Sequence, residues 1–233
     1  MKTVALIPAR GGSIGIPDKN IKEIYGKPLI SWSIEQALSS ESITDVFVST
    51  NSPKIAAVSL RAGAQVPFLR PEELSDDCSS TESAVIHFCQ YLDQNDISAD
   101  NILLIQCTSP VRAAGRFDDA IKFFVSNKYD SLLSVAENHH FYWKDTGSPT
   151  ANYDVKNRPR RQDISGKEHS YVETGSFYIF KKNLFAEEKN RIFGKIGLYK
   201  TPKTEMIDID NITDFLICER LLSLNNAKNI FVA

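Results

Sequence analysis

The residues best suited to chemistry begin near the N-terminus, in a polar segment that directly follows a short apolar run at residues 4–7. Arg10 and Lys19 flank this segment, and an arginine can grip phosphate oxygens with two hydrogen bonds at once. Glycine lets a backbone approach an anion closely, and free backbone N–H groups can hold phosphate. The segment contains three glycines: Gly11, Gly12 and Gly15. These residue types predict a polyphosphate site.

An ordinary connection between a strand and a helix, with solvated charges, is the alternative for this segment. Its glycine spacing does not match the G-x-G-x-x-G fingerprint of dinucleotide-binding proteins, and no Gly-Lys-Ser/Thr follows as in a Walker A loop. A dinucleotide-dependent oxidoreductase is therefore disfavoured. From this segment alone, a phosphate site and a plain connection both stay open.

A second candidate site lies near the C-terminus, where two acidic residues alternate with two isoleucines at residues 207–210. On an extended strand Asp208 and Asp210 point to the same side, and two carboxylates on one side can hold a hard divalent ion. The alternative is a cap, with Asp210 or Asn211 starting the final helix. Because a cap leaves Asp208 without a task, we favour a metal site.

A basic cluster lies in an irregular stretch at residues 146–167, which shows no hydrophobic periodicity. It contains Arg158, Arg160 and Arg161, followed by Gln162. Such a cluster is usually a solvated loop. Paired arginines are also what a substrate with a carboxylate requires, so both interpretations remain open.

The elements that must position these residues alternate along the chain. Apolar runs predict strands at residues 4–7, 45–49, 65–69, 101–106, 130–135, 175–180 and 197–200. Between them, helical spacing predicts helices at residues 28–40, 50–62, 82–92 and 115–127, with a last helix at 212–224. This alternation predicts an α/β fold with a parallel sheet. Ligands of such sheets bind beyond the carboxyl ends of the strands, so the ends of 4–7 and 101–106 should face one crevice.

Composition narrows the class of protein. The 233 residues suit one α/β domain, and 42% hydrophobic with 24% charged residues is typical of a globular protein. A net charge of −2 disfavours nucleic acid as a partner. No apolar run approaches the roughly 20 residues of a membrane span, and no signal-peptide pattern opens the chain. The four cysteines show no metal-type spacing, so we expect reduced thiols and a cytoplasmic protein.

The motifs together resemble the acylneuraminate cytidylyltransferases, also called CMP-sialic acid synthetases. They are Ala-Arg-Gly-Gly-Ser at 9–13, Arg-Pro-x-x-Leu at 70–74, Gln-x-Thr-Ser-Pro at 106–110, Arg-Pro-Arg-Arg-Gln-Asp at 158–163 and Ile-Asp-Ile-Asp at 207–210. They occur in the order of the family. The resemblance implies a Rossmann-like three-layer sandwich of the nucleotide-diphospho-sugar transferase type, with a mainly parallel sheet. It also implies one cytidylyltransferase domain over 1–233, an insertion at about 138–172 that forms a dimer arm, and a homodimer.

The reaction that the resemblance implies joins CTP to a nine-carbon keto acid, with Mg²⁺ as cofactor and pyrophosphate as the second product. No covalent nucleophile is required. The residues that it implies for the nucleotide are Arg10, Gly11, Gly12, Ser13, Asn20, Arg70, Ser80 and Thr81. Those for the sugar acid are Gln106, Thr108, Ser109, Arg160, Gln162 and Tyr178. Arg10, Lys19, Asp208 and Asp210 are the catalytic candidates, and the last two are also the metal candidates.

Two positions depart from the family pattern. Ile14 stands where the family usually has a lysine, and Thr174 stands where it typically has an asparagine. These differences leave open a cytidylyltransferase for legionaminate, pseudaminate or a related acid. A homologue that binds nucleotide sugars without turnover is the alternative from another class, and the intact pair Asp208 and Asp210 argues against it.

Overall fold

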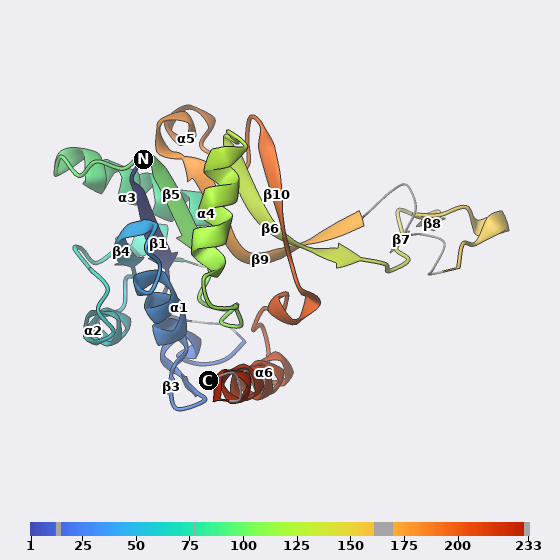
Figure 1. The fold of residues 1–233 in the computed structure, drawn as a ribbon, viewed down its shortest axis with the longest axis horizontal. Coiled ribbons are helices and arrows are strands. Elements are labelled where there is room, and N and C mark those ends of the chain that lie inside the picture. The colour runs from blue at the N-terminus through green and yellow to red at the C-terminus, as the bar shows by residue number, and fades with distance from the viewer. Residues whose placement is uncertain (13–14, 77, 161–169, 231–233) are drawn as a thin grey trace.

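A six-stranded sheet forms the centre of the molecule (Figure 1). The computed structural model describes residues 1–12, 15–76, 78–160 and 170–230. The strand order is β10-β6-β9-β5-β1-β4. The strands are β1 (Thr3–Pro8), β4 (Ile43–Ser49), β5 (Asn101–Ile105), β6 (Ser131–Asn138), β9 (Ser170–Lys181) and β10 (Ile196–Thr201). Only β9 runs antiparallel to its neighbours in this sheet. The mainly parallel α/β fold expected from the sequence is confirmed.

Helices cover both faces of the sheet and complete the three layers (Figure 1). One face buries its apolar side chains against α1 (Leu29–Leu38), α2 (Pro53–Arg61) and α4 (Arg116–Ser126). The other face packs against α3 (Thr81–Gln94) and α5 (Lys182–Glu188). A third apolar cluster joins α6 (Ile212–Ile230) to Ile16, Leu29 and Ile209. Burying one such large apolar side chain contributes about 1.5–3 kcal/mol.

Local capping explains where the helices begin. The Ser52 hydroxyl accepts a hydrogen bond from the Ile55 backbone N–H, and Pro53 occupies the first turn of α2, where its missing N–H costs nothing. The Ser80 hydroxyl accepts from the Ser83 N–H at the start of α3. The serine run before α3 therefore acts as a cap, and it also lies beside the candidate site.

Short elements fill the connections. After β1 come η1 (Lys19–Ile21) and the small hairpin of β2 (Glu23–Ile24) and β3 (Lys27–Pro28). A 3-10 turn, η2 (Glu72–Leu74), precedes α3, and η5 (Lys203–Glu205) follows β10. Between β6 and β9 the chain leaves the body and forms β7 (Trp143–Lys144), β8 (Thr150–Ala151) and η3 (Val155–Asn157). We call this projecting segment the arm; Figure 1 shows it extending away from the sheet.

Two expectations about strands need correction. Residues 65–69 form no strand. Gln65 makes an isolated parallel bridge to Phe47, and Leu69 makes another to Thr50. Pro67, between them, has no N–H to donate to a ladder, which explains the interruption. The acidic segment at 207–210 is also not a strand, although the Ile209 N–H donates to the Thr108 carbonyl at 2.9 Å.

Across the ranges that the structure describes, no helix is long and apolar enough to cross a bilayer.

Candidate active site

A cavity of about 430 Å³ opens at the carboxyl ends of β1 and β5, the place where the sequence predicted a crevice. Residues from four parts of the chain line it: 8–20, 70–81, 106–108 and Asp210. The lining residues that carry polar or charged side chains are Arg10, Lys19, Asn20, Arg70, Ser75, Asp76, Ser79, Ser80, Thr81, Gln106, Cys107, Thr108 and Asp210. The position follows from the topology, because the connections that leave neighbouring parallel strands gather at one edge of the sheet.

The glycine-containing loop after β1 is fixed by hydrogen bonds on both sides. The Gly11 N–H donates to the Asn51 side-chain carbonyl at 2.8 Å, which ties the loop to the end of β4. The Asn20 amide, in η1, donates to the Arg10 carbonyl at 2.9 Å. Asn20 is 6% exposed, so it braces the loop from beneath.

Cys107 extends this brace to the end of β5. Its thiol donates to the Asn20 side-chain oxygen at 3.2 Å. Complete burial raises the pKa of Cys107 to about 11, so the thiol stays protonated near neutral pH and can serve as a donor. Such a thiol is a poor nucleophile. Cys107 thus has a structural role, because it links the end of β5 to the glycine-containing loop after β1 through Asn20.

Positive charge is concentrated in the cavity. The Arg10 guanidinium donates to the Asp76 carbonyl at 2.7 Å, and Arg70 donates to the Ser75 hydroxyl at 2.9 Å. Burial, followed by the nearby charge of Arg10, lowers the pKa of Arg70. Like charges held together in this way cost free energy, which an anion placed between them recovers. With Lys19, these arginines make the cavity suited to a polyphosphate.

The loop and the acidic segment meet directly. The Lys19 ammonium donates to the Ile209 carbonyl, and its nitrogen lies 3.9 Å from an Asp210 carboxylate oxygen. At Gly15 an added Cβ atom would lie 2.2 Å from the Asp210 carbonyl oxygen. A glycine is therefore required at position 15 for this close approach. The two candidate sites found in the sequence form one site.

The cap at the start of α6 is provided by Asn211. Its side-chain oxygen accepts from the backbone N–H groups of Thr213, at 2.8 Å, and Asp214, at 3.1 Å. In return, an Asp214 carboxylate oxygen accepts from the N–H groups of Asp210 and Asn211, both at 3.1 Å. The cap that the sequence offered as the alternative is therefore present and is made by Asn211. A metal role for the carboxylates of Asp208 and Asp210 stays a prediction.

The donor set of the acidic pair fits a magnesium ion in part. Asp208 and Asp210 are exposed, and the Asp210 side chain is 81% accessible. Among the described residues there is no cluster of three or more His, Cys, Asp or Glu side chains that could enclose a metal. Mg²⁺ in nucleotide sites is commonly held by one or two carboxylates, with phosphate oxygens and water completing the shell. The exposed carboxylate of Asp210, which lines the cavity, with that of Asp208 two residues before it, is compatible with that pattern.

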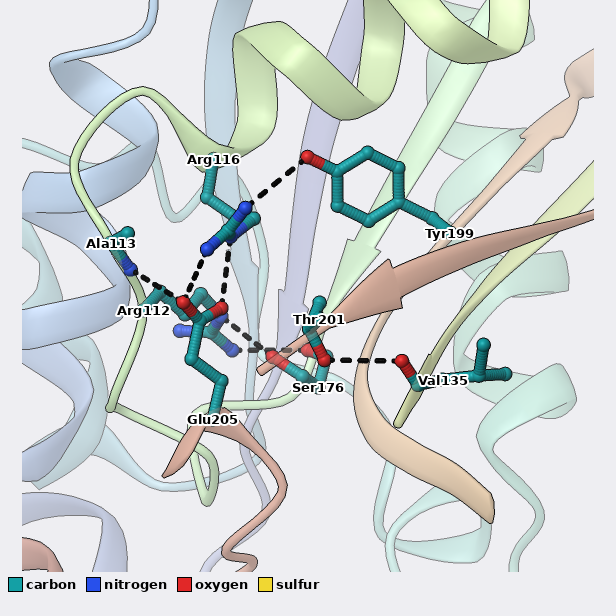
Figure 2. Close-up of polar contacts among 8 residues, drawn as sticks. All are labelled: Arg112, Ala113, Arg116, Val135, Ser176, Tyr199, Thr201 and Glu205. Atoms are coloured by element: carbon teal, nitrogen blue, oxygen red, sulfur yellow. Dashed lines mark hydrogen bonds and ion pairs between the residues drawn. The ribbon is translucent and has the colours of Figure 1, made fainter. Parts of the chain in front are cut away.

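A buried arginine fixes the floor beneath the site (Figure 2). Arg112 is 6% exposed, and its guanidinium donates to the hydroxyls of Ser33 and Ser176, the side chain of Gln36, and the carbonyls of Gln106 and Ser176. These contacts join α1, the end of β5 and β9. Burial lowers the pKa of Arg112 to about 10, so it stays charged near neutral pH. Arg112 thus holds Gln106 in place from behind.

The structure brings most predicted site residues to the cavity but not all of them. Those that line it are Arg10, Lys19, Asn20, Arg70, Ser80, Thr81, Gln106, Thr108 and Asp210. Gly11, in the loop, donates to Asn51, and Gly12 adopts a left-handed conformation with φ of 75°; neither is among the residues that line the cavity. Asp208 lies on the acidic segment next to Gly175. Ser13, Ile14 and Gln162 lie outside the described residues.

Three further candidates lie away from the cavity. Ser109 is fully buried, and within the described part of the chain its hydroxyl finds no hydrogen-bond partner. Tyr178 is 4% exposed; its hydroxyl donates to Glu173, and the Arg191 guanidinium lies 4.9 Å from its ring centroid. Arg160 is exposed on the arm. Their roles toward a sugar acid stay predictions.

Thr174, one of the two departures from the family pattern, is turned into the sheet. Its hydroxyl lies 2.7 Å from the Ser134 hydroxyl and donates to the Ser134 carbonyl at 3.2 Å. Gly175 follows with φ of 68°, at an irregularity in the pairing of β6 with β9. The Thr174 hydroxyl is therefore engaged inside the sheet and does not line the cavity.

Sequence reasoning missed several lining residues. Ser75, Asp76 and Cys107 all border the cavity. Asp76 lies two residues after the motif at 70–74, and this proximity was the available signal. Nothing in the sequence alone indicates that the Cys107 thiol braces Asn20, because the contact spans 87 residues.

A comparison with protein families places the chain. Residues 4–232 match the family model described as "Cytidylyltransferase". The chain belongs to the cytidylyltransferase family. The resemblance inferred from the sequence motifs is thereby confirmed at the level of the family.

Similar proteins of this family include "N-acylneuraminate cytidylyltransferase A" from Danio rerio, which is 38% identical over 222 residues. That alignment covers 93% of this chain and 50% of the relative, so the chain spans about half the length of that protein. "Pseudaminic acid cytidylyltransferase" from Campylobacter jejuni is 30% identical, with 97% of this chain and 98% of the relative covered. "CMP-N,N'-diacetyllegionaminic acid synthase" from Legionella pneumophila is 31% identical, and the alignment covers 97% of this chain and 98% of the relative.

Solved structures support the fold. A "CMP:2-keto-3-deoxy-manno-octonic acid synthetase complexed with CTP" has a TM-score of 0.71 at 15% identity, covering 96% of this chain and 99% of the other. A "4-diphosphocytidyl-2C-methyl-D-erythritol synthase" has a TM-score of 0.68 at 15% identity, covering 95% and 99%. At these identities the likeness concerns the fold, and it confirms the expected Rossmann-like nucleotidyltransferase architecture.

Proposed function

We propose that the chain transfers the cytidylyl group of CTP to a nine-carbon keto acid of the N-acylneuraminate type, giving the CMP-sugar and pyrophosphate. One observation carries this proposal: a cation-lined cavity at the carboxyl edge of the sheet is bordered by the exposed carboxylate of Asp210. The names of the similar proteins, which concern N-acylneuraminate, pseudaminic acid and legionaminic acid, support the substrate class.

The chemistry is one of positioning and charge. The anomeric hydroxyl of the sugar acid attacks the α-phosphorus, the new P–O bond forms, and the bond to the pyrophosphate oxygen breaks. Negative charge builds on the leaving pyrophosphate, so fixed cations beside it lower the barrier. Arg10 and Lys19 line the cavity and are held in place by neighbouring carbonyls, which suits them to this task. Arg70 and Thr81 would hold the nucleotide.

Asp208 and Asp210 would hold Mg²⁺. When bound there, the ion neutralises phosphate charge and lowers the pKa of a hydroxyl next to it. Both carboxylates are accessible, and the Lys19 nitrogen lies 3.9 Å from an Asp210 carboxylate oxygen. Gln106 and Thr108, which also line the cavity, would orient the sugar acid.

We also propose a homodimer in which the arm of one copy reaches the cavity of the other. Arg160 lies on the arm, away from the cavity of its own chain, so a role toward the sugar carboxylate requires a second copy. The arm also carries exposed apolar side chains: Tyr142 is 46%, Trp143 54% and Val155 59% accessible. Projecting apolar side chains of this kind favour a protein interface.

Two finer points complete the proposal. The second candidate substrate is pseudaminate or legionaminate, because relatives with those names align over 97% of this chain and 98% of their own length. We place the protein in the cytoplasm, in keeping with its free cysteines: Cys78, Cys89, Cys107 and Cys218.

The experiment is pyrophosphate release from CTP and Mg²⁺ with a panel of sugar acids. The panel contains N-acetylneuraminate, its deaminated analogue, legionaminate, pseudaminate and the eight-carbon octulosonate. We expect release with at least one nine-carbon acid and a loss of at least about 100-fold in Asp208→Ala. CTP binding without release in any reaction would instead support a binding protein that lacks turnover.

A further inference from the structure

An ion pair between the buried Glu205 and the partly buried Arg116 precedes the acidic segment, and nothing in the proposed mechanism uses it. We propose that Glu205 and Arg116 position the carboxylates of Asp208 and Asp210, and so tune the affinity of the site for a divalent cation. This inference rests on the proposed metal site. Neither partner lines the cavity, so both act through the segment that Glu205 precedes.

Glu205 is enclosed by donors (Figure 2). Glu205 is 5% exposed and is the last residue of η5. The Arg116 guanidinium donates to both carboxylate oxygens, from Nε to Oε2 at 2.9 Å and from Nη2 to Oε1. The Ala113 backbone N–H donates to Oε1 at 3.2 Å. A two-pronged arginine–carboxylate pair fixes orientation as well as distance, which a single contact does not.

The partner side of the pair is rigid. Arg116 is the first residue of α4, and its guanidinium also donates to the Tyr199 hydroxyl of β10 at 3.4 Å. Arg112, four residues earlier, is anchored to Gln106 and Ser176. Glu205 is therefore attached to the same framework that carries the floor of the cavity, so the end of η5 and the end of β5 keep a fixed relation.

Asp208 lies between two anchors of the chain. Glu205 fixes the position three residues before it, and the Ile209 N–H donates to the Thr108 carbonyl at 2.9 Å immediately after it. The Asp208 side chain is itself exposed. Its place is therefore set by its neighbours, and release of the Glu205 anchor frees the residues from 206 to 208 to move.

A purely stabilising role is the simpler explanation, and it predicts a different outcome. Buried ion pairs often contribute little net stability, so their presence alone says nothing about function. A positioning pair must change the metal affinity of the site, whereas a stabilising pair changes only the resistance to unfolding. Groups that orient metal ligands typically alter metal affinity by about 10–100-fold when they are replaced.

The test compares Glu205→Gln with the wild-type protein. Glutamine keeps the shape of the side chain and removes its charge. We measure binding of Mn²⁺ to the nucleotide-free protein by electron paramagnetic resonance, and the Mg²⁺ concentration that half-saturates turnover. We expect both to weaken about tenfold. The control is Lys181→Ala, which breaks the Lys181–Asp130 pair (2.7 Å) at the other end of the sheet and should leave both unchanged.

Arg116→Lys separates charge from geometry, because lysine keeps the charge but offers no planar pair of donors. We expect intermediate Mn²⁺ affinity in this variant. Unchanged Mn²⁺ affinity in Glu205→Gln, with only a lower melting temperature as in Lys181→Ala, would overturn the inference while the metal site stands. Absence of Mn²⁺ binding by the wild-type protein, together with turnover that needs no metal, would overturn both.

Discussion

Replacement of Gly15 by alanine is the sharpest test of how the site is assembled. An added Cβ would lie 2.2 Å from the Asp210 carbonyl oxygen. Real Cβ atoms essentially never come within 3.0 Å of such an atom. The obstacle is contact with backbone rather than with the flexible end of a side chain. The loop and the acidic segment must therefore move apart until this distance rises from 2.2 Å to at least 3.0 Å.

That separation acts on chemistry more than on stability. Overpacking of this kind costs about 1–3 kcal/mol of folding free energy. A displacement of about 1 Å between groups that act on the same substrate can cost on the order of 100-fold in rate. Because Lys19 and Asp210 lie on the two sides of the contact, we expect kcat/KM for pyrophosphate release in Gly15→Ala to fall about 100-fold.

The matched control is Gly197→Ala on β10. There an added Cβ would lie 2.6 Å from the Tyr129 ring, so the steric conflict is similar but distant from the cavity. We expect a lower melting temperature in both variants and a loss of kcat/KM in Gly15→Ala alone. Kinetics of Gly15→Ala equal to those of Gly197→Ala would refute the idea that contact at Gly15 assembles the site.

Three further predictions concern buried groups. Arg112→Met leaves buried acceptors without donors, so urea unfolding should show a loss of about 3 kcal/mol or more; a loss below about 1 kcal/mol would contradict the anchoring role. Burial and the charge of Arg70 lower the pKa of His87, so the unfolded chain takes up a proton first as pH falls below about 6.5, and stability drops. His87→Gln should lessen the drop in melting temperature between pH 7 and pH 5. An unchanged drop in this variant would show that His87 does not cause it. The pKa of Cys107, about 11, predicts that iodoacetamide leaves this thiol unmodified at pH 8 in the folded protein; rapid alkylation would contradict it.

Local rules account for much of the fold. Hydrophobic periodicity together with Ser52 and Pro53 predicts α2, and the serine run predicts the start of α3. The alternation of strands and helices predicts the parallel sheet and the edge at which the cavity opens. The strand expected at residues 65–69 fails because pairing at the edge of a sheet depends on each N–H, and Pro67 has none.

Contacts between distant residues could not be predicted from the sequence. The pair Arg116–Glu205 spans 89 residues, and no periodicity marks either residue. The close approach of Gly15 to Asp210 depends on how the loop after β1 and the segment before α6 pack together. The residue types at the site, by contrast, were visible at once, because phosphate and metal chemistry restrict them to cations, glycines and carboxylates.

The central claim is that this site transfers the α-phosphate of CTP to a sugar acid. The most direct test uses CTP labelled with ³²P at the α or at the γ position, Mg²⁺ and a nine-carbon keto acid. The α label should appear in the CMP-sugar and the γ label in pyrophosphate, and both products should form at least about 100-fold more slowly in Asp208→Ala. Transfer of the γ label to the sugar acid, or release of the α label as free CMP from the start, would contradict the account.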